Sequence, residues 1–322
     1  MLGIQLHYLR ERRSLSRAEL AMRAGINETE LARIETGKVA HVSGKQLLAL
    51  ADGLQLTHAH ELARLVQLNG TTRRFRAYVV GLSKTGTNSL YGIFGNYACA
   101  HDFWQGATRE HLIAFRRGAG TRAMLAEFMH ERDRAACAEL DAGNMLVHVI
   151  DVLAELFPEA KFVGLIRDPF SWVNAQVNYF TLPEHQALTT AELPSGFPFD
   201  LPRGVNSAKT ELIQNFPRYA EDIIAYWANS TRAMLAQLPA ERSLVIRTHE
   251  IAMRVDDLAQ FIGVPVETLR RDQTHLNRAQ YHVNALQLCD REFLRGVFDT
   301  HCNDLLAPHF PGFSLDRFLD SR

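Results

Sequence analysis

Short apolar runs alternate with helical patterns from residue 75 onward, and this alternation constrains the fold more than any other feature of the chain. Strands are expected at Phe75–Leu82, Ala160–Ile166 and Ser243–Arg247, with a weaker one at Cys137–Leu140. Helical patterns are found at 144–156, 170–180, 213–238, 248–261 and 286–305. Because strands that alternate with helices build parallel sheets covered on both faces, residues 71–322 are predicted to form an α/β domain.

The N-terminal part has a different pattern, in which apolar residues recur at helical spacing without strand-like alternation. This pattern indicates about five short helices. Ser16 and Glu19 have the spacing of a capping box, and Gly25 stands where a short helix would end. A polar joint at Asn69–Arg74 then separates a small all-α domain, residues 1–70, from the α/β domain.

Residues Leu15–Gly37 resemble a helix-turn-helix of the Cro type, in which the helix starting near Glu28 would read DNA. The charges give DNA little support, because Glu28 and Glu30 would face phosphates and residues 1–70 hold nine Lys or Arg against seven Asp or Glu. Arg17 also stands where this family commonly has glutamine. The all-α domain is therefore open to several roles: weak DNA binding, binding of a protein partner, docking on the α/β domain, or formation of a homodimer.

The overall composition restricts the remaining classes of function. The chain has 35 basic and 36 acidic residues, so it has no global attraction for nucleic acid or anionic membranes, and any anion site must be local. Its four cysteines lack the spacing of a zinc site or a disulfide framework. Since the start is not a signal peptide and no apolar stretch is long enough to span a membrane, we expect a cytoplasmic protein without a metal.

The segment Gly81–Leu90 follows the first expected strand and opens a helix. At such a junction the free backbone N–H groups and the helix dipole favour an anion. Gly86 lets the backbone approach phosphate oxygens, and Lys84 adds a full positive charge. Further polar side chains come from Ser83, Thr85, Thr87, Asn88 and Ser89. The segment is predicted to be a phosphate-binding loop.

The order of residues in this loop excludes a nucleotide-hydrolysing P-loop, which needs its lysine directly after the second glycine. Here Lys84 precedes Gly86 instead. The run Ser83–Leu90 resembles the K-[ST]-G-T-x-[ST]-L loop of sulfotransferases that use 3′-phosphoadenosine 5′-phosphosulfate (PAPS). The resemblance implies that the loop binds the 5′-phosphosulfate without a metal. It also implies that Lys84 stabilises the charge developing on the bridging oxygen as 3′-phosphoadenosine 5′-phosphate (PAP) leaves.

Arg167 stands at the carboxyl end of an expected strand, which is the edge where open α/β sheets bind ligands. An arginine there can hold a phosphate through two parallel hydrogen bonds, although a pair with Asp168 that only holds the turn is an alternative. Residues 156–174 resemble the sulfotransferase segment [FY]-P-x-A-K-[FV]-I-x-x-x-R-D-P-x-x-W. The resemblance implies that Arg167 binds the 3′-phosphate of the donor.

The resemblance extends over about residues 76–315 but has one departure. The family usually has a serine eight positions after its arginine, where this chain has Ala175, so Ser171, Asn174 or a backbone group would have to compensate. Near the C-terminus, Asn277 and Arg278 belong to a segment resembling one that closes over the donor. The Pro- and Gly-containing stretch 181–208 has no sustained period, and we interpret it as a candidate lid over the acceptor.

Sulfuryl transfer also needs a general base for the acceptor proton. Asp102 is the first candidate, with His101 as its orienting partner or rival, because both follow a short apolar segment that should end at the same edge of the sheet. Asp141, expected just after a strand, and His148, on the next helix, form a second set.

The resemblance thus implies a sulfotransferase fold and transfer of a sulfuryl group from PAPS to a hydroxyl or amine of a small-molecule, lipid or glycan acceptor. An alternative is a transcription regulator whose C-terminal domain senses a 3′-phosphorylated nucleotide without catalysis.

Overall fold

The computed structural model describes residues 1–39, 41–56, 65–66, 68–70, 72–180, 215–274 and 283–320. The stretch 181–208 and the residues Asn277 and Arg278 lie outside these ranges. Within them, no helix is both long and apolar enough to cross a lipid bilayer.

A parallel sheet of five strands forms the centre of the α/β part, in the order β2-β3-β1-β4-β5. Its strands are β1 (Ala77–Gly81), β2 (Cys99–His101), β3 (Leu140–Gly143), β4 (Lys161–Ile166) and β5 (Ser243–Arg247). The predicted parallel sheet is confirmed. Since all strands run the same way, all five carboxyl ends lie at one edge, and β1 lies between β3 and β4.

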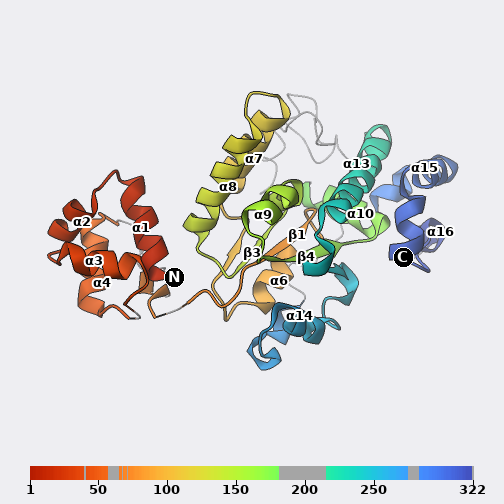
Figure 1. Ribbon diagram of the computed structural model, residues 1–322. Coiled ribbons are helices and arrows are strands. Elements are labelled where there is room, and N and C mark those ends of the chain that lie inside the picture. The colour runs from red at the N-terminus through yellow and green to blue at the C-terminus, as the bar shows by residue number, and fades with distance from the viewer. Residues whose placement is uncertain are drawn as a thin grey trace.

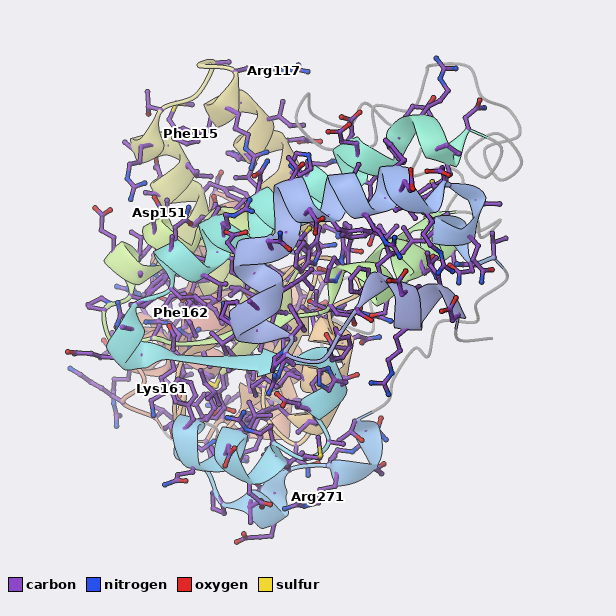
Figure 2. The ribbon with its side chains drawn as sticks, turned by 90° about the vertical axis from the view of Figure 1, so that its right-hand side faces the viewer. Phe115, Arg117, Asp151, Lys161, Phe162 and Arg271 are labelled. Carbon is purple, nitrogen blue, oxygen red and sulfur yellow. The ribbon has the colours of Figure 1, made fainter. Side chains whose placement is uncertain are left out.

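Helices cover both faces of this sheet (Figure 1). Successive residues of β1 point to opposite faces and therefore belong to two different hydrophobic cores. Tyr78 and Val80 join the core formed with α8 (Arg122–Ala136), α9 (Ile150–Leu156), α10 (Pro169–Phe180), α13 (Phe216–Gln237) and α15 (Arg291–His309). Ala77 and Val79 join the core formed with α6 (Thr87–Ile93) and α14 (Val255–Ile262). Figure 2 shows the same layers from the side of β5, with α13 and α15 on one side of the strand and α14 on the other.

The structure corrects several expected boundaries. The weak strand expected at Cys137–Leu140 is wrong: Cys137 has a φ of 45° at the end of α8, so the strand begins only at Leu140 and contains Asp141. Two helices before it, α7 (Gln105–Arg116) and α8, were not expected. In α8 the charged residues Arg132 and Asp133 are buried, which hides the apolar period that would mark a helix. The last helix, α16 (Leu315–Asp320), was also not expected.

The N-terminal helices are α1 (Leu2–Arg12), α2 (Arg17–Arg23), α3 (Glu28–Glu35) and α4 (Gly44–Gly53). The predicted capping box is confirmed, because the Glu19 backbone N–H donates to Ser16 Oγ at 3.1 Å and the Ser16 N–H donates to the Glu19 carboxylate at 2.6 Å. Gly25 adopts a φ of 62°, as a residue ending a helix should. Of the roughly five helices expected here, these four are described, and residues 57–64 lie outside the described ranges.

These helices pack on the α/β part through α1 and α8 (Figure 1). Leu2 and Leu6 share one buried cluster with Ala135 and Cys137. Arg134 Nη2 donates to the Glu11 carboxylate at 2.7 Å across this contact. A continuous apolar core therefore joins the two parts.

Candidate functional site

The predicted phosphate loop joins β1 to α6, and its shape depends on two glycines. A Cβ at Gly81 would lie 2.5 Å from Thr85 Oγ1 and 2.8 Å from the backbone oxygen of Leu165. Gly86 has a φ of 108°, and a Cβ there would lie 2.6 Å from Ile251 Cδ1. A side chain is therefore excluded at Gly81 by the Leu165 backbone and strained at Gly86 by its φ, and the backbone folds tightly between them.

Hydrogen bonds from the protein hold the carbonyl groups of this loop. Leu82 O accepts from Thr85 Oγ1 at 2.7 Å, and Ser83 O accepts from the Trp172 indole at 2.8 Å. Thr85 O accepts from Thr248 Oγ1 at 2.6 Å. These carbonyl oxygens are occupied by donors of the protein. The loop can therefore offer an anion its backbone N–H groups and the positive charge of its lysine.

Arg167 lies directly beside the loop. It follows β4, the strand next to β1, and its Nη1 donates to the backbone oxygen of Lys84 at 3.0 Å. Its Nε donates to Ser171 Oγ at 2.9 Å, while the backbone N–H of Ser171 donates to the Asp168 carboxylate at 2.8 Å. The two halves of the site expected from separate sequence motifs therefore form one positively charged surface.

Lys84 is partly buried at the centre of this surface. Burial, together with the nearby Arg167 guanidinium, lowers the pKa of Lys84. The Lys84 ammonium lies 4.6 Å from the centre of the Tyr179 ring. Burial raises the pKa of Tyr179, and the nearby Asp102 raises it further. The Tyr179 ring thus borders the donor half of the site.

His101 and Asp102 reach the same edge of the sheet, as expected. His101 Nε2 lies 3.3 Å from Thr87 Oγ1, at the start of α6, and its Nδ1 lies 3.6 Å from the Asp102 carboxylate. The backbone N–H of Asn144, which follows β3, donates to Asp102 Oδ1 at 3.2 Å. Asp102 is held in the left-handed region with a φ of 48° and stays about a quarter to a third exposed. A partly accessible carboxylate and imidazole therefore border the phosphate loop.

Comparison with known families agrees with this geometry. A family model described as a sulfotransferase domain matches residues 78–278, more than half of the chain, including the loop and Arg167. The chain belongs to the sulfotransferase family. A helix-turn-helix domain model matches residues 1–65. Among solved structures, the sulfotransferase domain from the curacin biosynthetic pathway matches with a TM-score of 0.33 and 14% identity, covering 66% of this chain and 83% of that one. No curated protein matches.

The second pair of candidate bases lies in less suitable surroundings. Asp141, inside β3, is 4% exposed, and both of its carboxylate oxygens accept hydrogen bonds from Arg132. His148 ends a short 3-10 turn, Met145–His148, and contacts Arg116 Nη2 at 3.1 Å through Nδ1. Burial and then Arg116 lower the pKa of His148 to about 3, and so weak a base accepts a proton poorly at neutral pH. In this sulfotransferase, His101 and Asp102 are the better placed pair.

Ala175, which replaces the expected serine, lies fully buried in α10. The idea that Asn174 compensates for it is not supported by the structure. The Asn174 amide donates to Asn284 Oδ1 at 2.9 Å, and its oxygen accepts from the backbone N–H of Ala285 at 2.9 Å. Ser171, whose hydroxyl contacts Arg167, remains a candidate to compensate for the missing serine.

Two residues of the site were missed from the sequence. Thr248 bridges the loop and β4, since its hydroxyl also contacts the Ile166 backbone oxygen at 3.1 Å. Its place directly after β5 is the signal that could have identified it, because polar residues at the carboxyl ends of strands face the site. Tyr179 had no comparable signal. Of the other loop residues, Ser83 donates to the Gln176 amide oxygen at 3.1 Å, and Asn88 and Ser89 lie in the first turn of α6.

Proposed function

We propose that this sulfotransferase moves a sulfuryl group from PAPS to a hydroxyl or amine of a small-molecule, lipid or glycan acceptor. The observation that carries the proposal is the contact between Arg167 and the backbone of Lys84, which puts two cations at adjacent strand ends. PAPS has two separate anionic groups, the 5′-phosphosulfate and the 3′-phosphate. We assign the first to the loop of Lys84 and Gly86 and the second to Arg167.

In the proposed reaction the acceptor oxygen or nitrogen attacks sulfur, and a new bond to sulfur forms. The bond between sulfur and the bridging oxygen breaks, and that oxygen takes the electron pair as part of the 5′-phosphate of PAP. Lys84 stabilises this developing charge, so a fixed cation in a partly buried loop lowers the barrier. The tight backbone around Gly86 orients the donor for in-line attack.

The proton released by the acceptor goes to Asp102 or to His101. His101 borders the loop through Thr87, and Asp102 lies beside His101. If Asp102 accepts the proton, His101 acts as its orienting partner; if His101 accepts it, Asp102 stabilises the resulting imidazolium. A larger loss of turnover in Asp102→Asn than in His101→Gln would assign the base to Asp102, and a larger loss in His101→Gln would assign it to His101.

Calorimetric titration tests the donor assignment. PAP should bind more tightly than AMP or ATP, and Arg167→Ala should remove this preference, a loss of about ten- to hundredfold for a charged hydrogen-bonded contact. Arg117→Ala, an exposed arginine at the end of α7, is the matched control and should keep the preference. Equal affinity for PAP and AMP in the unmodified chain would refute the assignment of Arg167.

A screen of acceptors with sulfur-labelled PAPS tests transfer itself. Transfer should be abolished in Lys84→Ala, whose circular dichroism should match that of the unmodified chain. Tight PAP binding without transfer to any acceptor class would instead favour a regulator that senses the nucleotide. The buried Ala175, which lacks the expected hydroxyl, is the feature that keeps this second function in view.

For the helix-turn-helix domain we propose docking on the sulfotransferase domain in preference to DNA reading. Its reading helix α3 begins with the exposed Glu28, and Glu30 accepts from the Gln46 amide at 2.6 Å. Arg17 Nε donates to the Glu35 carboxylate at 3.0 Å. We expect no binding to random duplex DNA at low salt; affinity that falls steeply with added salt would show the opposite.

A further inference from the structure

A pocket of about 500 Å³ lies where the helix-turn-helix domain meets the sulfotransferase domain. It borders the amino ends of the strands, because Arg73 and Arg76 precede β1 and Phe157 precedes β4. The phosphate loop lies at the opposite ends of the same strands. This pocket is therefore separate from the donor site.

Basic side chains from both domains line the pocket. Arg17 comes from α2, Arg73 and Arg76 come from the segment before β1, and Arg134 comes from α8. Against these four arginines, the lining residues include two carboxylates, Glu35 and Asp133. The lining thus has an excess of positive charge even with its two histidines neutral.

The two carboxylates are already shared among several donors. Asp133 accepts from Arg73 Nη1 at 3.0 Å, Arg76 Nη2 at 3.3 Å and the Tyr78 hydroxyl at 3.0 Å. Arg73 Nε, Arg73 Nη2 and Arg76 Nε are buried without any hydrogen-bond partner among the described residues. Buried guanidinium donors without acceptors are unfavourable. The described acceptors on this side of the pocket therefore do not satisfy all the donor groups of Arg73 and Arg76.

Glu35 is shared in the same way on the other side of the pocket. It accepts from Arg10 Nε at 2.6 Å and Arg17 Nε at 3.0 Å, and His7 Nδ1 lies 3.4 Å away. Arg76 and Arg134 have further partners outside the lining, in Glu159 and Glu11. These outer pairs fix the positions of the two arginine side chains.

An apolar surface completes the pocket. The Arg76 guanidinium lies 4.1 Å from the centre of the Phe157 ring, and the His130 ring lies nearly parallel to that ring at 6.2 Å. Ile4 contributes a side chain that is 39% exposed. The volume lies within the range of about 300 to 1,000 Å³ that holds small organic ligands, so the pocket can take more than a bare ion.

We propose that this pocket binds a small organic oxyanion, a phosphate or sulfate ester with an aromatic or apolar body, and that the bound anion ties the helix-turn-helix domain to the sulfotransferase domain. The oxyanion offsets the excess positive charge of this lining. Arg17 contacts it from the helix-turn-helix side, and the organic body lies against Phe157 and Ile4.

The test is calorimetric titration of the full chain carrying Lys84→Ala, which removes the lysine of the donor site. The probes are phenyl phosphate, phenyl sulfate and inorganic phosphate. One saturable site for a phenyl ester, with weaker binding of inorganic phosphate, is the expected result. The two esters differ in charge, so the tighter one identifies the class of anion. Absence of saturable binding for both esters would overturn the proposal.

Substitutions locate the site. Arg17→Gln or Arg134→Gln, each added to Lys84→Ala, should weaken binding of the phenyl ester by about tenfold. Arg23→Gln, on the same helix as Arg17 but outside the pocket lining, is the matched control and should leave it unchanged. Both tested arginines are about one-third exposed, so the variants should fold, which circular dichroism checks. Binding that survives both substitutions would overturn the proposal.

Discussion

The buried pair of Arg132 and Asp141 gives the strongest prediction, because it separates structure from catalysis at a residue that the sequence offers as a base. Arg132 is 2% exposed and Asp141 is 4% exposed. Arg132 Nη2 donates to Asp141 Oδ1 at 3.2 Å, Nη1 donates to Oδ2, and Nε donates to the Phe103 backbone oxygen at 3.0 Å. The pair therefore joins α8 to β3 and to the loop beside Asp102.

Asp141→Asn keeps the size of the side chain but removes its charge, which leaves the Arg132 guanidinium buried without a counter-ion. Removing one partner of a buried ion pair costs about 3–5 kcal/mol. Because the asparagine oxygen still accepts one hydrogen bond, we expect a loss near the lower end, about 3 kcal/mol. Such a loss is a large part of the 5–15 kcal/mol that stabilises a typical protein.

Urea unfolding followed by far-ultraviolet circular dichroism measures this loss as a lower midpoint. Transfer rate per folded molecule should stay within a few-fold of the unmodified chain at a temperature where Asp141→Asn remains folded. Asp102→Asn is the matched comparison, since its amide oxygen can still accept from Asn144, and it should lose rate but not stability. The double substitution Arg132→Met and Asp141→Leu should recover much of the stability, since an apolar pair replaces both charges.

The opposite pattern would refute this reasoning. If Asp141→Asn unfolded at the same urea concentration as the unmodified chain and lost transfer, Asp141 would take part in the reaction and the pair with Arg132 would not be structural.

Three further predictions concern the donor site. The lowered pKa of Lys84 means that its charge is lost as pH rises, so kcat/KM, which reports the free enzyme, should fall at a pH below the usual lysine value of 10.5. This fall at alkaline pH should be missing in Lys84→Arg, and its persistence there would assign it to another group. Gly86→Ala should abolish PAP binding in calorimetry and lower the melting temperature, because its Cβ meets Ile251 and the φ of 108° costs about 1–3 kcal/mol for alanine. Normal PAP affinity in this variant would show that the loop tolerates a side chain at position 86. Ala175→Ser should tighten PAP but not AMP binding, and an equal change for both nucleotides would place position 175 away from the 3′-phosphate.

Much of the donor site could be predicted from the sequence. Lys84 and Gly86 lie in the short turn between β1 and α6, and Arg167 directly follows β4. Local patterns identify both kinds of position, the turn before a helix and the carboxyl end of a buried strand. Their chemistry is also local, since it follows from the residue type and its place on a parallel sheet.

The boundaries and partners around the site were less predictable. The start of β3 moved because Cys137 ends α8 in the left-handed region, and α8 itself was hidden by buried charges. The choice between Asp102 and Asp141 depends on which carboxylate an arginine neutralises. Only the packing of α8 against β3 decides that.

The sequence by itself determined the two kinds of domain, the parallel sheet and the positions of the loop and Arg167, because these depend on the period of apolar residues and on neighbours within one turn or strand. Tertiary structure alone decided which charges are paired, as in Arg132 and Asp141, and which hydroxyl holds the loop, as Thr248 holds the backbone of Thr85. It also decided where the arginines before β1 lie against the helix-turn-helix domain. The physical reason is that burial and pairing energies depend on distances through space, and groups far apart along the chain come together only when the helices and strands pack.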